Sequence, residues 1–152
     1  MNNLACQLLD SIEYRFNTAV LESQPEFANF SPGNGSRTPL EIVSHLVNVM
    51  AKAEATLTER EAVAWRTNNL EAGVNQFRFI LHQLKDFIED NEVDSELLEI
   101  LIHGPISDVF GHIGQLVLMR VMSGKPMKRI NYMKAPVNLR LDIYQPAERV
   151  SG

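Results

Sequence analysis

Residues 105–126, PISDVFGHIGQLVLMRVMSGKP, constrain the fold of this chain more than any other segment. Proline suits the first position of a helix, because the N–H that it lacks has no helical partner there. The closing Gly-Lys-Pro is a typical helix stop. Between these ends, apolar or small side chains occupy nearly every face, which is typical of a buried helix. The segment therefore predicts a helix that lies in the interior of a helical fold.

Three polar side chains share one face of this predicted helix. Asp108, His112 and Gln115 stand at positions i, i+4 and i+7, so they point the same way. A carboxylate in apolar surroundings has to be paired, neutralised or bound to a metal ion. Asp108 and His112 are therefore candidate ligands for half of a metal site. The alternative is a plain hydrogen bond between them, or a solvated face, and the spacing alone leaves both interpretations open.

The rest of the chain also shows apolar residues at helical spacing. This pattern predicts helices over residues 2–21, 38–57 and 70–90, with a shorter helical piece over 94–102 that Gly104 and Pro105 end. The second helix has the clearest start, because Thr38 is a cap, Pro39 takes the first position and Glu41 completes a capping box. A long turn-rich loop over 22–37 precedes it, and a short helical turn is one option at 59–65.

No segment alternates apolar and polar residues as a half-buried strand does, so the expected fold class is all-α. Four long helices with short or moderate connections predict a four-helix bundle, with side chains of facing helices meeting inside it. The chain is expected to form a single domain over residues 1–152 with an irregular C-terminal tail that packs on the bundle. A short strand-like piece at 137–143 is one option within that tail.

Composition limits the function classes. Cys6 is the single cysteine, which excludes an internal disulfide and a cysteine-based zinc site. A net charge of −5 argues against nucleic acid as a partner. The chain has no signal-peptide pattern, and no run approaches the roughly 18 apolar residues that span a membrane. A cytoplasmic protein with no membrane association is therefore expected.

His45 is the candidate for the missing ligand. It is flanked by Ile42, Leu46 and Val49, which places it beside the buried face of the helix over 38–57. The second and fourth helices of a bundle can face each other, and His45 then meets Asp108 and His112. Two imidazoles and one carboxylate leave positions open on a divalent ion, which suits catalytic zinc or non-haem iron.

Two segments about sixty residues apart, TPLEIVSHL at 38–46 and DVFGHIGQL at 108–116, resemble the DinB-like superfamily. Met119-Arg120 and the helix stop that ends at Pro126 extend the resemblance, and residues 112–116 are its most specific part. The family is a four-helix bundle that also includes bacillithiol- and mycothiol-dependent transferases. The resemblance implies a divalent metal held by His45, Asp108 and His112. The commoner family pattern has histidine in place of Asp108, so this chain adds a negative charge to the site.

The resemblance also implies a chemistry and further candidate residues. The metal, whether zinc, nickel, iron or manganese, activates a thiol or water toward a small-molecule substrate, and a low-molecular-weight thiol is a possible second cofactor. Gln115 is a candidate to hydrogen-bond a bound ligand, and the alternative is that its side chain only packs against its neighbours. Glu41 is a candidate to orient His45, and the alternative is that it serves only in the capping box. Arg120 is a candidate to bind a substrate carboxylate, and the alternative is that its charge only complements the helix dipole.

Two functions remain open at this point. The first is a metal-dependent enzyme, a thiol transferase or a hydrolase. The second is a non-catalytic helical module that binds metal or dimerises in a stress response. The small residues Ser107, Gly111 and Gly114 allow close packing either within the chain or across a homodimer. His82, on the third helix, is expected at the surface or at the boundary of the core.

Overall fold

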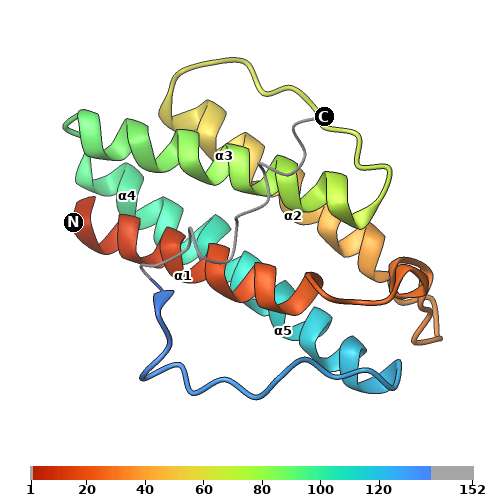
Figure 1. Cartoon of the computed structure of the whole chain (residues 1–152). Helices are drawn as coiled ribbons and strands as arrows, with labels where there is room; N and C mark the ends of the chain where they lie inside the picture. Colours follow the sequence, from red (N-terminus) through yellow and green to blue (C-terminus); the bar gives the residue numbers. More distant parts are fainter. Residues whose placement is uncertain (1, 138–152) are drawn as a thin grey trace, which may run out of the picture.

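A computed structural model gives the structure of the chain and describes residues 2–137. Four long helices pack together around a shared core: α1 (Asn2–Val20), α2 (Pro39–Leu57), α3 (Leu70–Asp90) and α5 (Ser107–Met122) (Figure 1). No strand occurs within residues 2–137, so the predicted all-α fold with four packed helices is confirmed. The strand-like option at 137–143 falls almost entirely outside the described residues. No helix in the described range combines the length and the apolar character needed to cross a membrane.

The start of α2 follows from its sequence. The hydroxyl of Thr38 accepts a hydrogen bond from the backbone N–H of Glu41 at 3.2 Å, and the Glu41 carboxylate accepts one from the backbone N–H of Thr38 at 3.3 Å. Pro39 is the first helical residue. This capping box is the predicted one, and a cap of this kind stabilises a helix by about 1 kcal/mol. It fixes the register of α2 and thereby the face on which His45 lies, two turns further along.

The entry into α5 differs from the prediction. Gly104 and Pro105 do not break the chain between two helices, since α4 (Ser95–Leu101), a π-helical turn η2 (Ile102–Ile106) and α5 follow one another without a gap (Figure 1). The predicted helix start at Pro105 was wrong, because this proline lies inside the π turn. A π turn bonds residues five apart, so it accommodates the missing N–H of proline, and the Ser107 hydroxyl donates to the carbonyl of Ile102 at 2.8 Å.

Two connections also differ in detail. The loop 22–37 contains a short 3-10 helix, η1 (Pro25–Asn29). The helical turn that the sequence allows at 59–65 is absent, and that segment is irregular. At its end, the backbone N–H of Trp65 donates to the Asn48 side chain at 2.8 Å, and the carbonyl of Trp65 accepts from it at 3.1 Å. These two bonds give the Trp65 backbone partners on α2 in place of those of a helical turn.

The tail continues past α5 and contacts α1. Residues 123–137 run back from the end of α5 toward the N-terminal end of α1 (Figure 1). The ring of Tyr132 meets that of Tyr14 edge-on at 6.4 Å between centroids, and the Arg15 guanidinium lies 3.8 Å from the Tyr132 ring centroid. Tyr132 therefore packs on α1 as predicted, and the part of the predicted tail beyond residue 137 lies outside the described residues.

Charged side chains also link α1 to α3. Lys85 Nζ lies 2.9 Å from Asp10 Oδ1, and His82 Nε2 lies 2.6 Å from Glu13 Oε1. Both carboxylates are buried, and Glu13 is only 1% exposed. We call these four residues the α1–α3 seam. His82 lies at the edge of the core, as predicted, and its partner is a buried acid.

Candidate metal centre

Helices α2 and α5 bring the three predicted ligands to one point. Asp108 Oδ2 lies 3.6 Å from His45 Nε2, and Asp108 Oδ1 lies 3.4 Å from His112 Nε2. One ligand-capable atom of each residue lies within 4.8 Å of the other two. The two imidazole rings meet nearly at right angles, with 4.8 Å between their centroids. Residues that are far apart in the chain thus form one cluster, which we call the triad.

The contacts of Asp108 with the two imidazoles are longer than usual hydrogen bonds. Hydrogen bonds between nitrogen and oxygen are about 2.7–3.2 Å long. Ligands arranged tetrahedrally at about 2.0–2.2 Å from a zinc-sized ion are separated from one another by roughly 3.3–3.6 Å. The contacts of 3.4 and 3.6 Å fall in the second range, each through a different oxygen of Asp108, and one donor atom of each residue lies within 4.8 Å of the other two. The donor set therefore fits a divalent metal by its chemistry, and a bound ion would draw the three donor atoms closer together.

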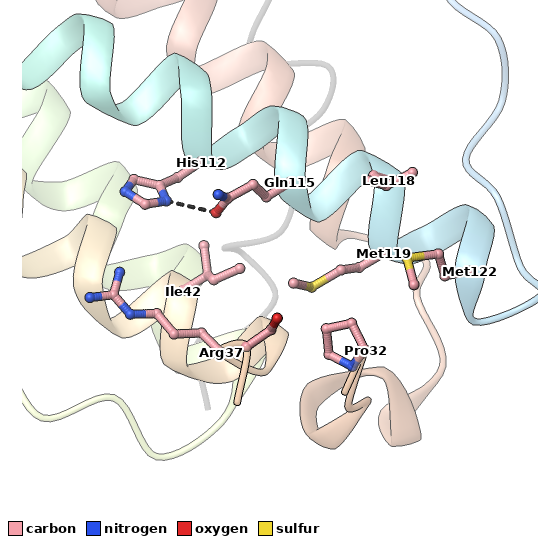
Figure 2. A pocket seen from close by; sticks show the side chains of 9 residues that line it. Pro32, Arg37, Ile42, His112, Gln115, Leu118, Met119 and Met122 are labelled. Carbon is pink, nitrogen blue, oxygen red and sulfur yellow. Dashed lines mark hydrogen bonds between the residues drawn. The ribbon is translucent and has the colours of Figure 1, made fainter. Parts of the chain in front are cut away.

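Gln115 orients His112 toward the triad. Its side-chain oxygen Oε1 lies 2.8 Å from His112 Nδ1 (Figure 2). A carbonyl oxygen only accepts, so Nδ1 donates its proton and Nε2 keeps the lone pair that a metal needs. Nε2 is the nitrogen that faces Asp108. Gln115 was proposed from the sequence to contact a bound ligand, and in the structure its oxygen contacts the His112 ring.

Solvent reaches the triad. The side chains of His45, Asp108 and His112 are 33%, 51% and 18% exposed. The expectation that α5 is buried on all faces was wrong, since Asp108 is half exposed and three apolar side chains near the end of the helix are 50–60% exposed: Leu118, Val121 and Met122. A helix in a four-helix bundle buries one stripe against its neighbours, and no other described element covers the outer face of α5.

The electrostatics keep His45 neutral. Partial burial is the largest cause that lowers its pKa below the usual 6.5, and the positive charge of Arg37 and the neighbouring His112 ring act in the same direction. Asp108 opposes this effect. A neutral imidazole is the form that binds a metal, so His45 is ready to act as a ligand at neutral pH.

Glu41 and Arg120 have other contacts. The Glu41 carboxylate accepts hydrogen bonds from the backbone N–H and the hydroxyl of Thr38, which is its capping role. Arg120 is 3% exposed, and it donates from Nη1 to the carbonyl of Ala19 and from Nε to that of Lys125, both at 2.8 Å. It thereby links the C-terminal ends of α1 and α5. Burial lowers the pKa of its guanidinium.

A groove of about 340 Å³ opens beside His112, between α5 and the loop that leads into α2 (Figure 2). Arg37 and Ile42 form one wall, and Gln115, Met119 and Met122 belong to the other. Sequence analysis missed Arg37, because a charged loop residue carries no periodic signal. Its position directly before the Thr38 cap, about two helical turns from His45, is the one sequence feature that links it to the site.

Comparison of the chain with protein-family models, with curated proteins and with solved structures finds no match.

Proposed function

We propose that this chain is a metal-dependent enzyme of the DinB-like superfamily, which uses a divalent ion held by His45, Asp108 and His112. The ion is zinc, nickel, iron or manganese, and the reaction is thiol transfer to a small molecule or hydrolysis of one. The observation that carries this proposal is the convergence of three donors from α2 and α5, with one ligand-capable atom of each residue within 4.8 Å of the other two. The order of the two motif segments along the chain supports the family assignment.

The coordination, the orientation of His112 and the access to the triad all suit a catalytic site. Three protein ligands leave part of the coordination sphere open, whereas a structural zinc site closes it with four. A divalent ion in such a site lowers the pKa of a thiol or water bound to it and supplies a nucleophile at neutral pH. Gln115 holds the His112 ring in the tautomer that this role needs. The groove beside His112 gives a small molecule a route to the triad.

A second candidate is a non-catalytic module that binds metal or dimerises. It is favoured by the apolar outer face of α5, where Leu118, Val121 and Met122 are exposed. A Cβ built on Gly111 or Gly114 meets nothing within 4 Å, so this part of α5 is also open to close approach. A second copy of the chain could cover this face, and light scattering at several concentrations measures whether it does.

One experiment separates the two candidates. Untagged protein is analysed for bound metal and then assayed with low-molecular-weight thiols and electrophilic acceptors, and separately with ester and amide substrates. The enzyme proposal expects about one divalent ion per chain and turnover that chelation abolishes. The matched variant His112→Ala, with helicity checked by circular dichroism, should lose both. Metal binding without turnover favours the non-catalytic module. A chain that binds no divalent ion contradicts the enzyme proposal and the metal-binding version of the module.

A further inference from the structure

The groove beside the triad is polar at one end and apolar at the other. Figure 2 shows the Arg37 guanidinium and the His112 ring near one end, and the side chains of Met119, Met122 and Pro32 toward the other. Ile42 and Gln115 lie between these ends. A molecule that fills the groove therefore meets a cation close to the triad and apolar groups further away.

Arg37 is available to a ligand. It is exposed, and it forms no ion pair with another side chain in the part of the chain covered by the structure. It lines the same groove as His112, and its charge is felt at His45. With a divalent ion in the triad, the positive charges of the ion and of Arg37 exceed the single negative charge of Asp108. This end of the groove then attracts an anion.

The lining also limits the class of anion. One guanidinium offers a planar pair of donors that matches a carboxylate or a phosphate, and its single positive charge balances that of one carboxylate. The apolar end, formed by flexible methionines with Leu118 beside them, suits an aliphatic body of variable shape. A volume of about 340 Å³ lies at the low end of the range for small-molecule sites, which is about 300–1,000 Å³. These features together describe a small amphiphilic acid.

We propose that the groove binds an organic carboxylate with an aliphatic body, with its carboxylate on Arg37 and its body on Met119 and Met122. This inference rests on the proposed function, because it names the class of substrate that the groove presents to the triad. Arg37 is in this scheme a positioning residue, which sets where the reactive part of the molecule lies relative to His45 and His112.

The test uses octanoate as the probe and octan-1-ol as its uncharged counterpart, each titrated calorimetrically into the full chain after metal removal. Without metal, the carboxylate cannot bind to an ion, so the titration isolates the contribution of Arg37. Because Asp108 then offsets the charge of Arg37, octanoate should bind more weakly than to the metal-loaded chain, but saturably, with a Kd of about 1–10 mM for the wild type. Arg37→Gln should weaken octanoate binding at least about tenfold and leave octanol binding within about twofold.

Two further variants serve as controls. Arg66→Gln removes an exposed arginine that does not line the groove, with the same change in net charge, and should bind octanoate as the wild type does. Met122→Gln should weaken octanoate and octanol alike, by about fivefold, because it removes apolar contact from the far end. Met122 is half exposed, so this variant should fold normally.

The outcomes separate this inference from the proposed function. Equal octanoate binding by wild type, Arg37→Gln and Arg66→Gln overturns it, as does the absence of saturable binding by the wild type. If either of these results appears while the chain binds metal through the triad, the inference about the groove fails and the proposed function stands. If octanoate binding depends on Arg37 but no divalent ion binds, the proposed function fails and the anion groove stands.

Discussion

The α1–α3 seam and the triad both pair histidine with a carboxylate across two helices, but they differ in burial and in spacing. In the seam, Glu13 is 1% exposed and its oxygen lies 2.6 Å from His82 Nε2, which is a short hydrogen bond. In the triad, the Asp108 side chain is 51% exposed and lies 3.4 and 3.6 Å from two imidazoles.

This difference shows how to distinguish a structural pair from a candidate ligand set. A buried carboxylate has to be hydrogen-bonded, because an unpaired buried charge costs several kcal/mol, so the contact between Glu13 and His82 is explained by the fold alone. Asp108 is under no such constraint, because water reaches it. Two imidazoles gathered around a half-exposed carboxylate at longer range form a possible metal site, and the stability of the fold does not require their contact.

The largest difference should appear in metal affinity. His112→Ala removes a ligand and should weaken zinc binding at least about 100-fold, which exceeds the usual effect of losing a residue that only supports a ligand. His82→Ala removes the histidine of the α1–α3 seam and should leave zinc affinity within about twofold. Competition titrations with a chelating dye measure both. Equal losses in the two variants would show that the triad is not the binding site.

The opposite ranking is expected for stability. Glu13→Ala should lower the free energy of unfolding of the metal-free protein by about 2–4 kcal/mol, because it breaks a buried pair. Asp108→Ala should change it by less than about 0.5 kcal/mol, because surface charge interactions contribute little. Urea unfolding followed by circular dichroism gives both values. A large loss of stability in Asp108→Ala would assign that carboxylate to the fold.

A smaller loss of zinc affinity tests the hydrogen bond between Gln115 and His112. Gln115→Leu keeps the size of the side chain but removes the acceptor for His112 Nδ1–H. Zinc affinity should fall about tenfold, the usual cost of losing a hydrogen bond to a ligand histidine. Asn75→Leu, which removes an exposed amide on α3, is the matched control and should leave zinc affinity unchanged.

The smallest effect concerns the titration of His45 without metal. Its pKa is lowered by burial first and by Arg37 second, so Arg37→Gln should raise it. Because the pKa of His45 is lower in the folded chain than in the unfolded chain, the unfolded chain binds more protons at pH values between these two pKa values. The contribution of His45 to stability is therefore complete above about pH 6.5 and is lost as the pH falls through the folded pKa. NMR titration of the His45 ring proton checks the shift, and an unchanged pKa would mean that Arg37 does not act on the ring.

Much of this arrangement was predictable from local rules. Capping chemistry at Thr38 and Glu41 fixed the start of α2, and helical spacing placed Asp108 and His112 on one face of α5. The pairing of α2 with α5 followed from bundle architecture and from the family resemblance. The tertiary contacts were not predictable in this way. The π turn places Pro105 inside a continuous helical run, which helix-start rules do not foresee, and the bond between Gln115 and His112 depends on side-chain rotamers.

Exposure was the least predictable property. The apolar character of α5 indicated burial on all sides, whereas its outer face carries the exposed Leu118 and Val121. Composition does not state which apolar residues a four-helix bundle can cover. For the same reason, the sequence did not show that Arg37 and His112 line one groove, because that contact joins a loop to a helix that is distant in the chain.

The most direct test is a crystal of the untagged protein grown with zinc, with anomalous diffraction recorded on both sides of the zinc absorption edge. We expect one strong anomalous peak within about 2.3 Å of His45 Nε2, of His112 Nε2 and of one carboxylate oxygen of Asp108. A map with no peak between these three side chains, while the His45 ring points to solvent, would contradict the assignment of the triad as a metal centre.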